Sequence, residues 1–168
     1  MKRLFTLDEQ NYDSCKSVIN RCTVRAVIIR DGRLAMQVNP AGHYKIPGGG
    51  PEDDETLMEA LRREVLEETG LHVRMDTVRP IGEVLEMRAD IFNPSYKFVR
   101  TSYFYFCDAE DTGDEPMLTK SEIRNGYTFV WETPEEILKN YTQKPRRDRD
   151  MEFIRILPQL LREDPGEG

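Results

Sequence analysis

The sequence predicts an α/β fold in which a mixed β-sheet is packed between helices, as a helix–sheet–helix sandwich. Three observations support this prediction. Apolar, β-branched segments recur along the chain, and amphipathic helical patterns occupy Glu55–Thr69 and Met151–Leu161. Strands mixed with helices in this way bury their sheet beneath helical layers. The chain has 168 residues and no internal repeat, so we expect one domain spanning 1–168, with a loose tail at 162–168.

The first predicted strands form a hairpin. Thr23–Ile29 and Leu34–Val38 are rich in apolar residues, and the pair Asp31–Gly32 stands between them. An Asp-Gly pair flanked by such segments is typical of a two-residue hairpin turn. A loop rich in proline and glycine then leads to the first predicted helix.

This helix follows three glycines, Gly48–Gly50, and we expect it to begin with the acidic run Glu52–Asp54. Acidic residues there complement the positive end of the helix dipole. The pattern runs up to Gly70, which fits the left-handed position that ends many helices. With about 100° of rotation per residue, one apolar stripe should face the core. Its members are Leu57, Leu61 and Val65.

Two glutamates of this helix fall on the core-facing side. Glu64 and Glu68 lie in or beside the apolar stripe, and Glu67 lies at its edge. Glu64 and Glu68 are i, i+4 neighbours of like charge, which is unfavourable on an open helix and more so when desolvated. Three carboxylates beside a single arginine, Arg63, favour a site for a hard cation such as Mg²⁺ or Mn²⁺. The pattern alone also allows a solvated acidic face, where most charged residues lie.

The second half of the chain contains three more predicted strands and two helices. The strands are Pro80–Met87, Tyr96–Cys107 and Tyr127–Trp131. The segments Ala89–Ser95 and Asp108–Ser121 are polar and are predicted to be loops. A cap signature at Thr133–Glu136 indicates a short helix, and the basic stretch Lys144–Arg149 precedes the last amphipathic segment. The aromatic residues of the Tyr96–Cys107 strand could stack on a base or fill the sheet, and the sequence leaves both open.

Composition limits the classes of function. The net charge of −7 argues against broad nucleic-acid binding, but it allows a nucleotide held through metal ions. The cysteines Cys15, Cys22 and Cys107 contain no C-x-x-C pair. That pattern argues against a disulfide framework or a zinc site and suits a reducing, cytoplasmic location. We expect no signal peptide, no membrane span and no membrane partner.

The spacing from Gly49 onward resembles the Nudix box, G-x5-E-x7-R-E-U-x-E-E-x-G-U, where U is aliphatic. The fixed positions are filled in order by Gly49, Glu55, Arg63, Glu64, Val65, Glu67, Glu68, Gly70 and Leu71. A match at every fixed position of so long a pattern is a specific signal. The flanks also resemble the family, with a hairpin before the box, the lead-in Pro47–Gly49, and T-P-E-E after Trp131.

The resemblance implies the Nudix fold, an α/β/α sandwich with a mixed β-sheet, and hydrolysis of a nucleoside diphosphate linked to another group X. It also implies the ligands of Mg²⁺ or Mn²⁺, which would be the carbonyl of Gly48 and the carboxylates of Glu64, Glu67 and Glu68. Arg63 would hold these glutamates by ion pairing, and Glu55 would support the junction between loop and helix.

Members of the family differ in the group that deprotonates the attacking water. A box glutamate or an acid from a later loop would serve, and Glu122 is our candidate for the outside acid. An ordinary surface glutamate is the alternative interpretation of Glu122. Arg25, Tyr44 and Lys45 are candidate substrate contacts, because Arg25 interrupts an apolar strand and the other two precede the glycines. A solvated strand face is the alternative for Arg25.

The substrate is less defined than the chemistry. We find no mark of the subgroups that act on ADP-ribose or coenzyme A, so we expect a nucleoside di- or triphosphate, including a damaged one. A non-catalytic Nudix-fold sensor that binds a nucleotide is the alternative function. The presence of all three box carboxylates favours the enzyme. The sequence leaves the oligomeric state open, a homodimer included.

Overall fold

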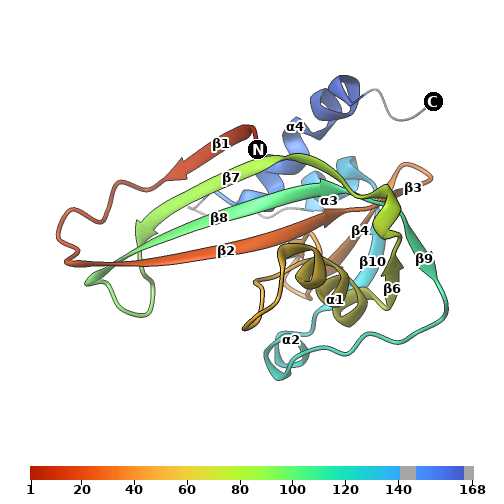
Figure 1. Cartoon of the computed structure of the whole chain (residues 1–168), viewed down its shortest axis with the longest axis horizontal. Helices are drawn as coiled ribbons and strands as arrows, with labels where there is room; N and C mark the ends of the chain where they lie inside the picture. Colours follow the sequence, from red (N-terminus) through yellow and green to blue (C-terminus); the bar gives the residue numbers. More distant parts are fainter. Residues whose placement is uncertain (141–146, 165–168) are drawn as a thin grey trace.

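The computed structural model describes residues 1–140 and 147–164 and has a mixed α/β architecture (Figure 1). The strands are β1 (Arg3–Asp8), β2 (Ser17–Val27), β3 (Ile29–Arg30), β4 (Arg33–Val38), β5 (Tyr44–Lys45), β6 (Leu71–Val73), β7 (Arg79–Ala89), β8 (Tyr96–Phe106), β9 (Ala109–Asp111) and β10 (Thr128–Glu132). The helices are α1 (Leu57–Thr69), the 3₁₀ helix η1 (Met75–Thr77), α2 (Lys120–Arg124), α3 (Pro134–Asn140) and α4 (Arg149–Glu163).

The strands form a mixed sheet and an antiparallel sheet. The mixed sheet has the order β1-β7-β8-β2, in which β1–β7 and β8–β2 are parallel and β7–β8 is antiparallel. In the second sheet β4 pairs with β10, β3 and β5, and β6 pairs separately with β9. Figure 1 shows α1 on one side of these strands and α4 on the other, while β2, β7 and β8 extend beyond the helices. The predicted α/β fold with a mixed sheet is confirmed.

Each face of the strands has its own apolar core, as the period of two along a strand requires. In β4, Leu34 and Met36 join the core beneath α3 and α4, whereas Ala35 joins the core beneath α1. The first core contains the stacked rings of Phe104 and Phe153, whose centroids are 4.1 Å apart. Both helical layers are therefore held by alternate residues of the same strands.

Helix α1 ends where the sequence predicts but begins later. Its N-cap is Thr56, and a capping box links the Thr56 and Glu59 side chains to each other's backbone N–H groups. The acidic run that we expected to open the helix lies before this cap, so that boundary was wrong. At the other end, Gly70 is the left-handed C-cap, with φ of 75°. Leu61 and Val65 are fully buried, as the apolar stripe predicts.

The predicted hairpin turn is confirmed between β3 and β4, but the predicted first strand is wrong in part, because Thr23–Val27 belong to β2 and pair with β8. Ile29 pairs with Leu34, and Asp31 and Gly32 both have positive φ angles, as a tight hairpin turn requires. The segment predicted as the loop Asp108–Ser121 instead contains β9 and the start of α2. Both elements are very short, so their apolar period is too brief to detect.

The two ends of the chain pair with other elements. Strand β1, which we did not predict, pairs with β7. Helix α4 contains Pro158 and runs to Glu163, whose side chain accepts a hydrogen bond from Lys2. The expected loose tail therefore begins with helical residues, and its residues 165–168 lie outside the described part. Lys144–Arg146 of the predicted basic stretch also lie outside it. Within the described ranges, no helix is long and apolar enough to cross a membrane.

Candidate catalytic site

The glycine loop that precedes α1 lies against the edge of β2. Val24 N–H donates to the carbonyl of Gly49, and Ala26 N–H donates to that of Pro47, both at 2.9 Å. Gly48 has φ of +142°, and a Cβ there would lie 2.0 Å from the Val24 carbonyl oxygen. Only glycine permits this close approach of the loop to the strand.

Glu68 approaches the same loop from α1. Its Oε2 accepts a hydrogen bond from Gly48 N–H at 2.8 Å, and the residue is 5% exposed. Burial raises the pKa of Glu68 to about 8, although the Arg25 charge and the Gly48 N–H act in the opposite direction. Glu68 thus lies on the core-facing side of the helix, as the periodicity predicts, and carries a carboxylate that lacks sufficient positive charge around it.

Arg63 gathers the other acidic residues of the box. Its guanidinium binds Glu55 through two contacts of 2.7 and 2.8 Å, and it donates to Glu64 at 2.9 Å and to Glu67 at 3.1 Å. A further hydrogen bond reaches the carbonyl of Gly50 at 3.1 Å. The Arg63 hydrogen bonds lower the pKa of Glu55 to about 2, whereas burial raises that of Glu64. Arg63 therefore links the loop before α1 to acidic side chains of the helix, while its role and that of Glu55 stay predictions.

The three carboxylates among the predicted metal ligands do not converge into a closed cage. Among residues 1–140 and 147–164, no group of three or more Asp, Glu, His or Cys side chains is arranged to hold a metal ion. The contacts explain why, since Arg63 engages Glu64 and Glu67 while Glu68 is bound to Gly48 N–H. Carboxylates beside a backbone carbonyl are nevertheless the donors that Mg²⁺ prefers. Burial raises the pKa values of Glu64 and Glu68, so a cation bound between their carboxylates would offset part of the cost of burying them. The metal role of these residues stays a prediction.

The structure brings Glu122 and Lys45 to this site. Glu122 lies on α2 beside Glu68, and Lys45 Nζ lies 3.8 Å from Glu122 Oε1. Lys45 Nζ also lies 4.0 Å from the centroid of the Tyr127 ring. Burial acts to raise the pKa of Glu122, but hydrogen bonds from Thr119 and the Lys45 charge outweigh it, so the pKa is lowered. Glu122 is therefore ionised at neutral pH.

Arg25 and Tyr44, the other two predicted substrate contacts, are both buried. Arg25 Nη1 donates to the carbonyls of Ile46 and Gly48, each at 2.9 Å, and the side chain faces the loop instead of solvent. Tyr44 is 9% exposed and packs in the core beneath α3 and α4. Their contact with substrate stays a prediction.

Sequence reasoning missed two residues that hold the loop from α4. Asp150 Oδ2 accepts a hydrogen bond from Ile46 N–H at 3.0 Å, and Arg149 Nε donates to Asp150 Oδ1 at 2.7 Å. Both residues are more than nine-tenths buried. The sequence R-D-R-D at 147–150 is the one signal that could have identified them, because such a run at the start of an apolar helix leaves charges near the core.

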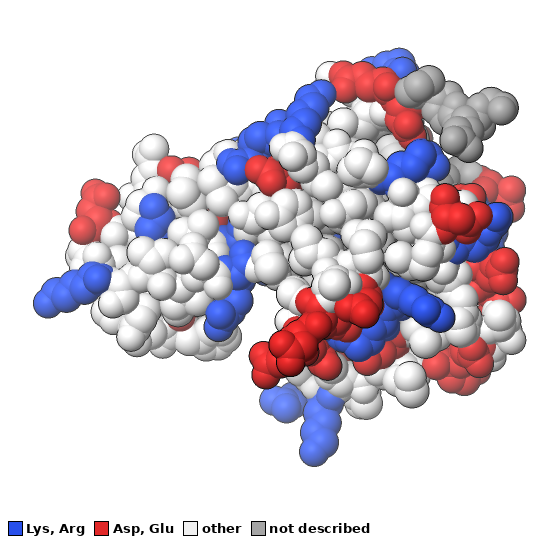
Figure 2. All heavy atoms as spheres, viewed as in Figure 1, with Lys and Arg blue, Asp and Glu red and all other residues white. Residues whose placement is uncertain are grey.

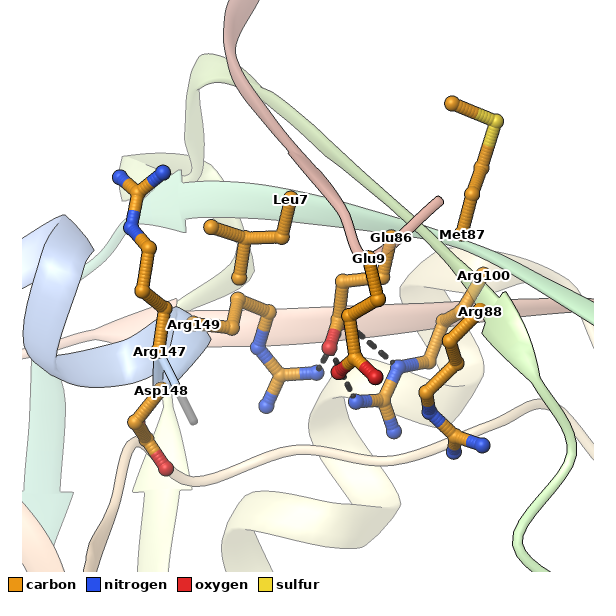
Figure 3. A pocket seen from close by; sticks show the side chains of 9 residues that line it. All are labelled: Leu7, Glu9, Glu86, Met87, Arg88, Arg100, Arg147, Asp148 and Arg149. Carbon is orange, nitrogen blue, oxygen red and sulfur yellow. Dashed lines mark hydrogen bonds and ion pairs between the residues drawn. The ribbon is translucent and has the colours of Figure 1, made fainter. Parts of the chain in front are cut away.

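A pocket of about 220 Å³ lies on the side of the sheet that faces α4. Its lining residues are Leu7, Glu9, Glu86, Met87, Arg88, Arg100, Arg147, Asp148 and Arg149. Figure 3 shows the Arg100 and Arg149 guanidinium groups meeting at Glu86. On the face drawn in Figure 2, acidic and basic side chains lie side by side over α1 and the preceding loop. Arg149 thus belongs both to the pocket wall and, through Asp150, to the support of the glycine loop.

Comparison with known proteins identifies the family of the chain. A family model described as the NUDIX domain matches residues 20–153. Among curated proteins, no significant match to the sequence was found.

Solved structures share the fold. A MutT NUDIX hydrolase from Burkholderia pseudomallei has 18% identity and a TM-score of 0.58, with 81% of this chain and 95% of that chain covered. An ADP-ribose pyrophosphatase from Streptococcus suis has 18% identity and a TM-score of 0.55, with coverage of 88% and 94%. A UDP-X diphosphatase has 17% identity and a TM-score of 0.58, with coverage of 88% and 66%. At these identities the likeness is one of fold.

Proposed function

The chain belongs to the Nudix hydrolase family, and from this premise we propose that it cleaves the pyrophosphate linkage of a nucleoside diphosphate derivative with the help of Mg²⁺ or Mn²⁺. The observation that carries the proposal is the position of Glu68. A glutamate that is 5% exposed and whose pKa is raised by burial, despite the Gly48 N–H and the Arg25 charge, is unfavourable for stability. Such a group is suited to binding a cation beside the Gly48 loop.

The residues divide into metal ligands and supports. Glu64, Glu67, Glu68 and the Gly48 carbonyl would hold the divalent ion, and Arg63 would keep Glu64 and Glu67 oriented toward it. The bound ion supplies charge neutralisation on the phosphates and lowers the pKa of a coordinated water. The glycine loop and α1 supply position, because in-line attack depends on the placement of water and phosphate.

Glu122 and Lys45 would act on the reacting groups. Glu122 is ionised and lies beside Glu68, so it is suited to accept the proton of the attacking water. Lys45 carries a positive charge at the same point and is suited to bind a phosphoryl oxygen once the substrate enters.

The remainder of the substrate would occupy the pocket bordered by Arg149. Its arginines and carboxylates offer hydrogen-bond donors and acceptors for a polar group, such as the nucleoside or X. We favour a nucleoside di- or triphosphate, including a damaged one. The structural neighbours named for ADP-ribose and UDP-X make those compounds the main competitors. The free cysteines Cys15, Cys22 and Cys107 suit action in the cytosol.

A substrate screen tests this function. The purified protein is incubated with nucleoside di- and triphosphates, oxidised nucleotides, ADP-ribose and nucleotide sugars in Mg²⁺, and released phosphate and pyrophosphate are measured. We expect cleavage of a nucleoside di- or triphosphate that stops in EDTA and returns with Mg²⁺ or Mn²⁺. Full activity in EDTA contradicts the metal dependence, and cleavage of ADP-ribose or nucleotide sugars alone contradicts the substrate choice. Nucleotide binding without any cleavage favours the sensor.

A further inference from the structure

We propose that Arg25 is a positioning residue of this site: with the Arg149–Asp150 pair of α4, it fixes the backbone of Ile46–Gly48 against Glu68. The kinetic consequences of this inference rest on the proposed function, whereas its structural consequence does not. Arg25 would thus act through the glycine loop and not by touching the substrate.

The first observation is the set of hydrogen bonds that side chains make to the backbone of the loop. Arg25 Nη1 donates to both the Ile46 and the Gly48 carbonyl at 2.9 Å, while Asp150 accepts from Ile46 N–H at 3.0 Å. Gly48 N–H donates to Glu68 at 2.8 Å. Both polar backbone groups of Ile46 and both of Gly48 are therefore engaged by three side chains, and all three of those residues are more than nine-tenths buried.

The second observation is that further contacts hold these side chains in place. Arg149 binds Asp150 at 2.7 Å and Ser102 Oγ at 3.1 Å, and Thr23 Oγ1 donates to the same Ser102 Oγ at 2.9 Å. Arg149 Nη1 also lies 3.5 Å from Glu86 Oε2. Strand β8 and helix α4 thus anchor the Arg149–Asp150 pair, so two rigid elements fix the position of the glycine loop.

The third observation is that Arg25 is buried. Burial lowers the pKa of Arg25 to about 10, which still leaves it charged at neutral pH. Its buried Nε has no hydrogen-bond partner among the described residues. An incompletely satisfied buried guanidinium is unfavourable for stability, and an apolar residue would fit an apolar strand better. The two carbonyl contacts explain why an arginine stands there. A carbonyl oxygen has two lone pairs, so the Gly48 oxygen keeps one available beside Arg25.

Arg25→Met, Arg25→Lys and Asp150→Asn test the inference, with Arg3→Met as the control. Arg3 is also a strand arginine, but it pairs with Glu83 on the edge strand β1, away from the loop. Hydrogen exchange by mass spectrometry follows the amides of residues 44–50 and, as an internal reference, those of β8. We expect Arg25→Met to lose protection in 44–50 while β8 stays protected. Arg25→Lys should keep part of the protection in residues 44–50, and Arg3→Met should show the same protection there as the wild type.

Kinetics on the best substrate provide the second readout. Loosening the loop should lower kcat by roughly 10- to 100-fold and leave KM nearly unchanged, because misplacement of catalytic groups acts on the transition state. Asp150→Asn should also lower kcat. In the Arg25→Lys/Asp150→Asn double variant, the fold-loss of kcat should be smaller than the product of the two single fold-losses, because both residues hold the same loop. Should Arg25→Met fail to fold, Arg25→Lys and Asp150→Asn carry the test.

Three outcomes overturn the inference. These are unchanged exchange in 44–50, an equal loss of protection throughout β8, and a raised KM with normal kcat, which would make Arg25 a substrate contact. If the wild type cleaves no nucleotide, the proposed function fails, and the exchange measurement still decides the role of Arg25.

Discussion

Two arginines hold the triple glycine from opposite sides, and they do so in different ways. Arg63 donates to the carbonyl of Gly50 from the solvent side, where its side chain is 22% exposed. Arg25 donates to the carbonyl of Gly48 from the buried side. Arg63 is surrounded by carboxylates of its own segment, whereas Arg25 binds backbone carbonyls and shares Ile46 with the distant Asp150. The first arrangement orients acids, and the second fixes a backbone.

The difference also affects what each contact contributes. Partly exposed ion pairs such as those of Arg63 are screened by water and contribute little to stability. Buried groups such as Arg25 and Asp150 lose their hydration, so removal of one leaves its partner unsatisfied. We therefore expect variants on the Arg63 side to act mainly on metal and rate, and variants on the Arg25 side to act also on loop order.

The largest effect should come from Glu68, where the two sides meet. Glu68→Gln preserves shape and removes one predicted metal ligand, so turnover should fall by roughly two to three orders of magnitude. In EDTA the variant should melt no lower than the wild type, because it also removes a desolvated carboxyl group. With Mg²⁺ the order should reverse, because ligand binding stabilises the wild type more.

Thermal melts with and without Mg²⁺, beside a rate assay, check this prediction. Near-normal turnover would mean that Glu68 binds no catalytic ion. A lower melting temperature than the wild type in EDTA would mean that Glu68 stabilises the fold.

The next effect sharpens the role of Arg63. Arg63→Met leaves Glu55, Glu64 and Glu67 without their shared partner, and loss of a group that orients metal ligands typically costs roughly 10- to 100-fold in metal affinity or activity. Arg63→Lys should keep more activity than Arg63→Met but less than the wild type, because an ammonium cannot bind Glu55 through two parallel contacts. The rate of each variant is measured as a function of Mg²⁺ concentration. If the Mg²⁺ concentration that gives half the maximal rate is unchanged, Arg63 does not orient the metal ligands.

A smaller effect concerns pH in the absence of divalent ions. The pKa of Glu68 is raised in the folded state to about 8, above its unfolded value, so its contribution to stability is full below the unfolded pKa. That contribution is lost as the pH rises through about 8. In EDTA the wild type should melt at a lower temperature at pH 8.5 than at pH 6, and Glu68→Gln should show a flatter dependence. Parallel pH profiles for the two proteins would contradict the raised pKa.

The smallest effect is expected at Tyr44, which we first placed among the substrate contacts. Tyr44→Phe removes only a hydroxyl from a residue in the core beneath α4, so kcat and KM should stay close to the wild-type values. Steady-state kinetics on the same substrate provide the measurement. A large rise in KM would show that the hydroxyl reaches the substrate.

The sequence allowed prediction of those elements whose signals are local. The α1 stripe and the Asp31–Gly32 turn depend on neighbouring residues, and both are found as expected. The start of α1 was misplaced because an acidic run was taken for its first turn, although Thr56 and Glu59 have the spacing of a capping box. Strand β1 was missed because Leu7 is the one buried residue among its six, so the segment carries little of the apolar pattern of a core strand.

The same distinction applies to the site. The contacts of Arg63 join residues at most 13 positions apart, so motif spacing could suggest them. Asp150 reaches Ile46 across 104 positions, and only the packing of α4 against the strands brings them together. Arg25 drew attention as a charge in an apolar strand, but whether it faced solvent, substrate or backbone depended on the tertiary fold.

The contact between Asp150 and the glycine loop has a consequence for biosynthesis. The loop and the box helix are complete once about two-fifths of the chain has been made, yet the residue that holds Ile46 N–H belongs to the last helix. A domain generally folds as a unit, although its N-terminal segments are synthesised first. The growing chain would therefore present all the box carboxylates long before their loop is secured. Competence for hydrolysis should therefore arise only after α4 has emerged from the ribosome and docked against the loop.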